Sequence, residues 1–478
     1  MRRVLVLLCL SVSCLLNGQT KKPNMIVIMT DDLGYADVGF NGSKDIPTPN
    51  IDRIAKNGVK FTNGYTSYSV CGPSRAGFIT GRYQQRFGFE RNPQYKSDDP
   101  NMGLPKDENT IAETLKKVGY TSGIIGKWHL GSHISNHPLN RGFDEFYGHL
   151  GGGHQYYPEN LTLKDSYFTG DDVKVFVTET RKTKKLSAEL ASYRTLILRN
   201  HKPIKTKKYL TEEFSDEAVS FVERNKDKPF FLFLSYNAPH IPLQATKKYL
   251  DRFPNIKNKK RKTYAAMVSA VDDGVGLLLN KLEALNLDEN TIVVFLSDNG
   301  GPESKNGSNN GILREGKGSI YEGGFRVPFA LQWKGHVKHG VYNNPVSSLD
   351  IFATIASLSK APINKDKPLD GVNIIPYLQN TKRGVPHQNI FIRKYDNDLH
   401  SIRDGDYKLI VKWKGNKKEL YNLEDDISEK NNIAKQHPKE VNRLYKLLKD
   451  WESELKDPTF LGLIHTKAWV NKRKKKKN

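Results

Sequence analysis

The sequence contains few cysteines, three among 478 residues, at positions 9, 14 and 71. Three cysteines cannot build the disulfide framework of a small secreted protein, so that class is excluded. Cys9 and Cys14 lie near the N-terminus, in a stretch that we interpret as a cleaved leader. The mature protein would then keep Cys71 alone. An unpaired thiol is a liability in an oxidising compartment unless it is buried or chemically used, which makes Cys71 a candidate functional residue.

Long apolar runs are also scarce. One stands at the start, from residue 4 to residue 16, behind two arginines. It is too short to span a bilayer, and its charged start predicts a signal peptide over residues 1–18. A lipid anchor at Cys14 is the weaker alternative, because residues 11–13 match the required signal poorly. No later stretch is apolar enough to be a transmembrane anchor, so we expect an exported protein, periplasmic or secreted.

Acidic residues are outnumbered by basic ones, 52 against 75, which leaves a formal net charge of +23. So basic a protein favours a polyanionic partner, which could be a nucleic acid, an anionic membrane or a sulfated or phosphorylated polymer. The predicted export and the lack of a recognisable binding module argue against nucleic acid. The lysine-rich end, residues 466–478, is interpreted as a basic tail.

Wholly apolar strands alternate with helices of 3.6-residue periodicity, which predicts an α/β fold. We assign residues 19–375 to a catalytic domain with a mixed or parallel sheet flanked by helices, and residues 158–208 to a variable insertion in it. Hairpin signals and one amphipathic helix predict a smaller α+β subdomain, with an antiparallel sheet, over residues 376–465. Helices are expected near residues 49–58, 110–119, 211–224, 263–285, 348–358 and 439–455.

Polar side chains follow several of the apolar strands directly. Asp31 and Asp32 follow the run 25–29, and Asp298 and Asn299 follow the run 292–296. Ligands of open α/β sheets bind at the carboxyl ends of the strands, and carboxylate and amide oxygens suit a hard cation. These residues therefore predict a cation site.

Cys71 precedes a helix that we expect to run on from Ser74, with Pro73 as its first residue. The thiol would lie at the positive end of that helix, and Arg75 would lie one turn on, able to brace an oxyanion. Lys127 and His129, two apart in an expected extended segment, would project to one side. This places an unusual nucleophile near two further polar groups.

Three loops supply the remaining candidates. His240 stands between two prolines and is a candidate general acid. Lys317 lies in a glycine-rich segment and could reach inward. A glycine-rich loop carries His154 and Tyr156, whose aromatic faces would suit a sugar. Together with the preceding groups, this inventory fits cleavage of a tetrahedral oxyanion ester.

The motifs that carry these residues resemble the signature of the type I, formylglycine-dependent sulfatases. The match rests on Cys71-Gly-Pro-Ser-Arg75 with Thr80-Gly-Arg82, Thr30-Asp-Asp-Leu-Gly34, Gly126-Lys-Trp-His-Leu-Gly131, Pro239-His240, Ser297-Asp-Asn-Gly300 and Glu322-Gly-Gly-Phe-Arg-Val-Pro328. The resemblance runs from about residue 24 into the C-terminal subdomain and fails over residues 158–208. It implies an alkaline-phosphatase-like fold, and oxidation of Cys71 to formylglycine by a formylglycine-generating enzyme, a maturation partner.

The resemblance also implies site roles. One Ca²⁺ would be held by Asp31, Asp32, the modified residue 71, Asp298 and Asn299. The aldehyde hydrate would attack sulfur while Lys127, Lys317 and the metal neutralise the sulfate. His240 would protonate the departing sugar oxygen, His129 would draw a proton from the second hydroxyl to expel sulfate, and Arg75 would orient residue 71.

The resemblance leaves the substrate open. We expect a marine algal polysaccharide or its oligosaccharides, of the ulvan or carrageenan type, with His154, Tyr156, Arg91 and Asn92 as candidate sugar contacts. The glycan, the ester position, exo or endo action and the oligomeric state are not readable from the sequence. Two alternatives stay open, a phosphoester or phosphonate hydrolase of the same superfamily and a non-catalytic protein that binds sulfated glycans.

Overall fold

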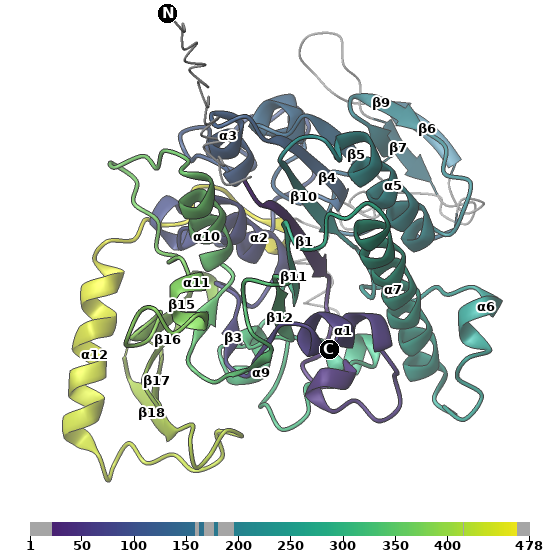
Figure 1. Cartoon of the computed structure of the whole chain (residues 1–478). Helices are drawn as coiled ribbons and strands as arrows, with labels where there is room; N and C mark the ends of the chain where they lie inside the picture. Colours follow the sequence, from purple (N-terminus) through teal and green to yellow (C-terminus); the bar gives the residue numbers. More distant parts are fainter. Residues whose placement is uncertain (1–21, 158–161, 167–175, 180–195, 414, 466–478) are drawn as a thin grey trace, which may run out of the picture.

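A ten-stranded sheet forms the centre of the computed structural model (Figure 1). The structure describes residues 22–157, 162–166, 176–179, 196–413 and 415–465. The four strands at the centre of the sheet are parallel and follow from the apolar runs of the sequence. In spatial order these are β11 (Thr291–Ser297), β1 (Asn24–Thr30), β10 (Phe230–Ser235) and β4 (Thr121–Lys127). Strands buried on both faces are expected to be largely apolar, and the interiors of β1, β10 and β11 are, whereas β4 contains Thr121, Ser122 and two glycines.

Shorter strands extend the sheet on both sides of this centre. On the side of β4 these are β5 (Glu145–His149), parallel to β4, and the antiparallel pair β8 (Ile197–Arg199) and β9 (Lys202–Ile204). On the side of β11 these are β12 (Phe329–Gln332), β2 (Val59–Phe61) and β13 (Gly340–Tyr342). The sheet is therefore mixed, with antiparallel pairs only outside its parallel centre.

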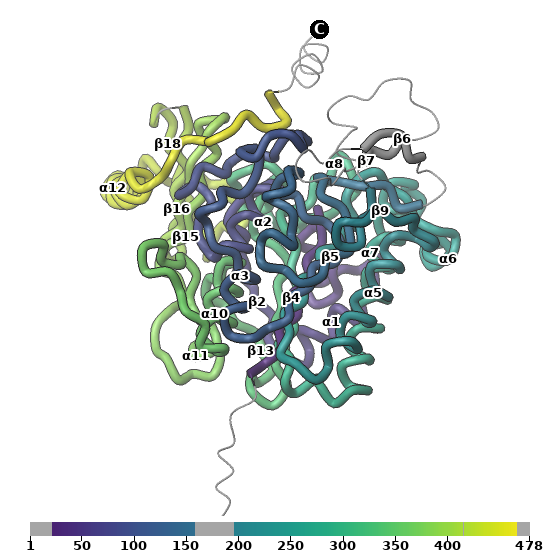
Figure 2. Tube along the Cα trace, turned by 90° about the horizontal axis from the view of Figure 1, so that it is seen from above, coloured from purple at the N-terminus to yellow at the C-terminus, as the bar shows by residue number. Residues whose placement is uncertain are grey.

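Helices cover both faces of the sheet. Successive residues of β1 point to opposite faces, so this strand contributes to the core under both sets of helices. Met25, Val27 and Met29 pack into the hydrophobic core under one set of helices, and Ile26 and Ile28 into the core under the other. The first set is α2 (Cys71–Thr80), α3 (Ile111–Lys116) and α10 (Asp350–Ser359), and the second is α1 (Pro49–Lys56), α5 (Leu210–Asn225) and α7 (Lys259–Ala284). Figure 2 shows the two sets on either side of β4. Every helix expected in this domain is present.

Helix α2 begins earlier than the sequence predicts. Its first residue is Cys71 instead of Pro73, and the backbone N–H of Ser74 already donates to the carbonyl of Val70 over 3.1 Å. The expectation was wrong because proline fits anywhere in a first turn, where no N–H has a helical partner to lose. Cys71 consequently lies within the first turn of the helix.

A second, four-stranded antiparallel sheet forms the C-terminal subdomain, as the hairpin signals predict. Its strands, in spatial order, are β15 (Asn389–Lys394), β16 (Leu399–Asp404), β17 (Tyr407–Lys412) and β18 (Lys417–Asn422). Helix α12 (Pro438–Glu452) packs on this sheet, and the core that they form includes Tyr83 and Leu349 of the larger domain. Figure 1 shows this subdomain at one side of the molecule, away from α5 and α7. The proposed division at residue 375 stays a prediction.

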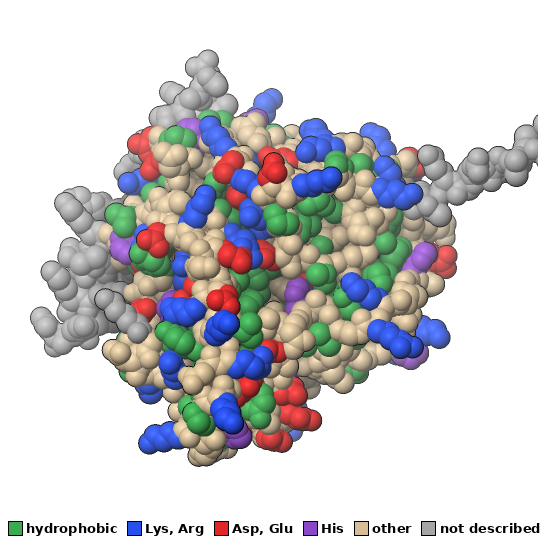
Figure 3. Space-filling model, turned by 90° about the vertical axis from the view of Figure 1, so that its left-hand side faces the viewer, with side chains coloured by type: hydrophobic (Ala, Val, Ile, Leu, Met, Phe, Trp, Pro, Cys, Tyr) green, Lys and Arg blue, Asp and Glu red, His purple; other side chains and the backbone are tan. Residues whose placement is uncertain are grey.

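The expected insertion is described in part. Strand β6 (Thr162–Ser166) pairs with β7 (Phe176–Glu179) as an antiparallel hairpin. The signal peptide, Cys14 and the basic tail lie outside the described residues. Among the described helices, none has the length and apolar character needed to cross a bilayer. Figure 3 shows lysine and arginine side chains spread over the face that carries the C-terminal subdomain, with acidic side chains among them.

Candidate active site

The carboxyl ends of β1 and β11 bring four oxygen-bearing side chains together. The two strands are parallel and in register, with Thr30 opposite Ser297, so the residues that follow them emerge side by side. Asp31, Asp32, Asp298 and Asn299 are buried there. The amide Nδ2 of Asn299 donates to Asp32 Oδ1 over 2.7 Å.

Three cations from other elements pair with these acids. Lys127 Nζ, at the end of β4, lies 2.6 Å from Asp31 Oδ2, and both side chains are fully buried. Arg75 Nη2, on α2, lies 2.8 Å from Asp298 Oδ2.

Lys317 is the third cation and lies in the glycine-rich segment. Its Nζ is 2.6 Å from Asp32 Oδ1 and 3.2 Å from the Cys71 sulfur. Buried charges persist only when they are paired or hold a ligand, so this cluster is a built polar site.

The electrostatics of the acids are strongly uneven. Burial alone would raise the pKa of Asp31, but Lys127, His240 and Arg75 hold it well below its usual range. Burial, together with the charge of Asp31, raises the pKa of Asp298 to about 7. Two carboxylates that repel each other in a buried place favour a cation between them.

Two buried oxygens of this cluster have no hydrogen-bond partner within the described residues. They are Asp31 Oδ1 and Asn299 Oδ1. One donor atom each from Asp31, Asp32, Cys71 and His240 lies within 4.8 Å of the others. Such orphaned oxygens are costly unless an ion or water satisfies them, and carboxylate and amide oxygens are the ligands that Ca²⁺ prefers. The residues fit a hard divalent cation.

Cys71 is a buried thiol at the start of α2. Burial raises its pKa to about 11, in spite of the opposing charges of Lys127 and Lys317. The unmodified side chain is therefore a protonated thiol near neutral pH, and a protonated thiol is a poor nucleophile.

His129 is buried at the site, but not through the extended segment that we expected. Its backbone φ is 63°, so the chain turns left-handed directly after β4. Lys127 and His129 still meet the same cluster, because the turn redirects the histidine. Burial, Lys127 and Arg75 hold the pKa of His129 well below its usual range. The imidazole is neutral and can accept a proton.

His240 is the second histidine that faces the acids of the cluster. Its Nε2 lies 3.6 Å from Asp32 Oδ2, and its Nδ1 lies 2.6 Å from the carbonyl oxygen of Ile241. Burial lowers the pKa of His240, while Asp31 and Asp32 act in the opposite direction. The ring is thereby oriented with Nε2 toward the cluster.

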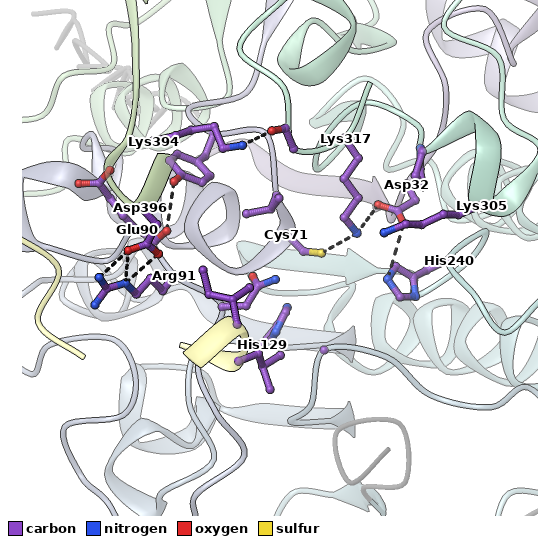
Figure 4. Close-up of a pocket in the computed structure, with 18 of the residues that line it drawn as sticks. Asp32, Cys71, Glu90, Arg91, His129, His240, Lys305, Lys317, Lys394 and Asp396 are labelled. Carbon is purple, nitrogen blue, oxygen red and sulfur yellow. Dashed lines mark hydrogen bonds and ion pairs between the residues drawn. The ribbon is translucent and has the colours of Figure 1, made fainter. Parts of the chain in front are cut away.

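A cavity of about 330 Å³ opens over this cluster (Figure 4). Of the predicted site residues, those that line it are Asp32, Cys71, Arg91, Asn92, His129, His240 and Lys317. The others of the cluster lie behind this lining. Asn92 Oδ1 also accepts the backbone N–H of Gly72, and Arg91 pairs with Asp396.

Two predicted sugar contacts do not line the cavity. His154 and Tyr156 are both buried. The hydroxyl of Tyr156 lies 2.6 Å from the carbonyl oxygen of Asn237 and 2.8 Å from that of His240. Tyr156 therefore supports the segment that carries His240, and contact of either residue with a sugar stays a prediction.

Sequence reasoning missed the wall that the C-terminal subdomain contributes. Lys394, the last residue of β15, lines the cavity together with Asp396 and Asn397, which follow that strand. No local motif marks them, since they reach the site only through the packing of one sheet against another domain. The charged and polar run 393–398 is a signal that could have drawn attention to them, but the sequence prediction did not use it.

Comparisons with known proteins agree with this geometry. A family model described as Sulfatase matches residues 23–361, and one described as N-sulphoglucosamine sulphohydrolase, C-terminal, matches residues 316–457. The N-acetylgalactosamine-6-sulfatase of Mus musculus is 32% identical over 421 residues, which cover 84% of this chain and 75% of that protein. An arylsulfatase of Hemicentrotus pulcherrimus is 34% identical over 397 residues, covering 81% and 67%.

Solved structures resemble most of the chain. The crystal structure of Ps i-CgsB in complex with k-i-k-neocarrahexaose has a TM-score of 0.83 and 41% identity, covering 95% of this chain and 97% of that one. The phosphonate monoester hydrolase of Agrobacterium radiobacter, at 18% identity and a TM-score of 0.63, shares the fold alone. The predicted alkaline-phosphatase-like fold is confirmed.

Proposed function

Because the chain belongs to the sulfatase family, whose members hydrolyse sulfate esters, we propose that it releases sulfate from a sulfated algal galactan of the carrageenan type. The observation that carries this substrate is the 41% identity to Ps i-CgsB, which was solved with k-i-k-neocarrahexaose. The net charge of +23 supports an anionic polymer. This likeness favours carrageenan over ulvan, the other polymer that the sequence suggested.

The cavity residues support distinct roles in such a reaction. Lys317 reaches the cavity beside residue 71 and would bind the sulfate oxygens. Lys127 lies deeper, against Asp31, and adds positive charge to the same place. His129, held neutral, would take a proton from a hydroxyl on residue 71. His240 would give a proton to the sugar oxygen as it leaves.

Residue 71 and the metal complete the proposal. Conversion of Cys71 to formylglycine by a maturation enzyme would supply, as an aldehyde hydrate, the nucleophilic oxygen that a protonated thiol lacks. Ca²⁺, held by Asp31, Asp32, residue 71, Asp298 and Asn299, would supply charge that stabilises the sulfate oxygens. Arg75 would fix this arrangement, since its guanidinium contacts Asp298, the Ser235 hydroxyl and the Lys127 carbonyl. Export to the periplasm or medium, where algal polymers are met, belongs to the same proposal.

Free sulfate is the readout that tests the proposal. The protein is co-expressed with a formylglycine-generating enzyme, and peptide mass confirms the modification at residue 71. Sulfate released from iota-carrageenan or its oligosaccharides, and absent with Cys71→Ala, is the expected result. Ulvan and a phosphate ester are tested in parallel. A modified protein that releases phosphate but no sulfate would overturn the proposal in favour of the phosphoester alternative, and release from ulvan alone would overturn the substrate.

A further inference from the structure

Trp413 is exposed in a position that the fold does not favour. It follows β17 directly, 57% of its surface is exposed, and its φ is 54°. Left-handed backbone suits glycine or asparagine and is unfavourable for a bulky side chain. An exposed indole also forgoes the stabilisation that burial would bring. A residue that breaks two local preferences at once points to a task outside folding.

The surroundings of Trp413 connect it to the cavity. Its backbone N–H donates to the carbonyl of Asp398 over 3.2 Å. Asp398 directly follows Asn397, which lines the cavity wall. The Trp413 backbone therefore lies beside the loop that forms the cavity wall, on the C-terminal subdomain.

One lysine lies close to Trp413, and another lines the cavity. Lys417 Nζ lies 5.6 Å from the centre of the Trp413 ring and 3.0 Å from Glu419 Oε1, and half of the Lys417 side chain is exposed. Inside the cavity, Lys394 donates from Nζ to the carbonyl of Gly318, and none of the described carboxylates lies within 4 Å of that nitrogen. Figure 4 shows Lys394 on the side of the cavity opposite His240. Half-buried ammonium groups of this kind are normally paired, so Lys394 has capacity for an anionic ligand.

We propose that Lys394, Trp413 and Lys417 form a track that holds a sulfated glycan chain where it leaves the active-site cavity. The proposal rests on the proposed function and deepens it, since it makes the substrate a chain of several sugars. The flat face of Trp413 stacks against the apolar face of a sugar ring. The two lysines pair with sulfate groups on either side of that ring.

Charge and continuity identify this occupant. The track begins in the cavity, which Lys394 lines, and it continues along the strand ends of the C-terminal sheet, where Lys394, Leu399, Lys412 and Lys417 stand opposite one another in register and Trp413 follows Lys412. A neutral glycan would have no use for the cations. An anionic lipid surface would not need a path into the cavity, and it is one outcome of the test below.

Binding without turnover is the first test. The Cys71→Ala protein is run through gels that contain iota-carrageenan or plain agarose, and retardation gives the affinity. We expect Trp413→Ala to weaken binding to iota-carrageenan about fivefold, because loss of one aromatic stacking contact lowers an affinity by about that factor. Trp413→Tyr should restore most of the binding to iota-carrageenan. Lys417→Ala should weaken that binding by a similar factor, and its effect should shrink as salt is added. Plain agarose should not bind the protein.

Matched controls lie elsewhere on the surface. Leu277→Ala removes another exposed apolar side chain, and Lys247→Ala another exposed lysine, on α6 (Lys247–Leu250). Both are expected to leave retardation unchanged. Equal effects of the controls and of Trp413→Ala would overturn the track, and so would absence of binding in the parent protein. Loss of binding to anionic phospholipid vesicles alone, with polymer binding intact, would overturn it in favour of a membrane.

Kinetics of the formylglycine-containing enzyme separate the track from the activity. Trp413→Ala should raise KM for polymer about fivefold with kcat unchanged, and should leave a small aryl sulfate unaffected, because that substrate is too short to reach the track. Sulfate release unaffected by Trp413→Ala would overturn the track and leave the function standing. Polymer binding that depends on Trp413, without any sulfate release, would overturn the function and leave the track standing.

Discussion

Two clusters of buried acids and lysines can be compared within this protein, and only one of them opens on a cavity. At the active site Lys317 joins Asp32 and the Cys71 sulfur beneath the cavity. Between the larger domain and the C-terminal sheet, Lys408 joins Glu322 and Glu429, each over 2.8 Å, and all three are fully buried.

The two clusters differ in how completely they satisfy their oxygens. At the domain interface Glu322 also accepts from the Tyr65 hydroxyl and from Arg326, so both of its oxygens have partners. Glu429 Oε1 accepts no hydrogen bond within the described residues but lies 2.8 Å from the Lys408 ammonium. At the active site Asp31 Oδ1 and Asn299 Oδ1 have none among the described residues. The comparison teaches that buried acids and lysines hold two domains together where their polar atoms are paired with one another, and can bind a ligand where some of their oxygens are left without a partner.

Removing the interface lysine should have the largest effect on stability. Lys408→Ala leaves two buried glutamates without their shared cation, which should lower the free energy of unfolding by about 3–5 kcal/mol. Denaturant unfolding measures it. The matched control is Lys412→Ala, four residues further along β17 on the same face of the sheet. The ion pair of Lys412 with Glu419 is only partly buried. A loss no larger than that of the control would contradict the closed-cluster interpretation.

Removing the active-site lysine should instead act on catalysis. Lys317→Ala is expected to lower kcat by about 100- to 1000-fold, as for other groups that stabilise developing charge. Its unfolding free energy should change far less than that of Lys408→Ala. Lys305→Ala, an exposed lysine on the same cavity, serves as control and should retain most of the activity. Retained activity in Lys317→Ala would place the sulfate elsewhere.

Calcium should distinguish the open cluster from the closed one. At 100 times its Kd, Ca²⁺ should stabilise the formylglycine-containing protein by about 3 kcal/mol, seen as a rise in Tm. Asp298→Asn should abolish most of that rise, because it removes one ligand charge. Glu429→Gln, at the interface, should leave the rise intact. A rise that persists in Asp298→Asn would show that the ion binds at another place.

The smallest expected effect is on the pH dependence of stability. Burial raises the pKa of Glu429 to about 7, above its value in the unfolded chain. The folded state then holds a proton that the unfolded state has released, so stability falls as pH rises from about 4.5 to 7. We expect Glu429→Gln to reduce the fall between pH 5 and pH 7 by an amount on the order of 1 kcal/mol. Urea titrations at both pH values measure the free energy of unfolding. An equal fall in that free energy for the parent protein and for Glu429→Gln would contradict the prediction.

Much of the active-site cluster is encoded locally. Asp31 and Asp298 follow apolar strands, and parallel strands in register place their ends side by side, so short motifs were enough to predict which residues meet. The capping box of α3 at Thr110 and the helical periodicities were equally readable. The family resemblance rests on the same local motifs, and the family comparisons agree with it.

Other features were decided only by tertiary structure. The left-handed turn at His129 and the burial of His154 and Tyr156 depend on what packs around them. Lys394 lines the cavity, and Trp413 lies beside the loop that forms its wall, because the C-terminal sheet packs against the larger domain, more than 300 residues along the chain from Cys71. Local patterns are set by contacts among neighbours in sequence, whereas these placements depend on contacts between distant segments, which no single stretch of sequence records.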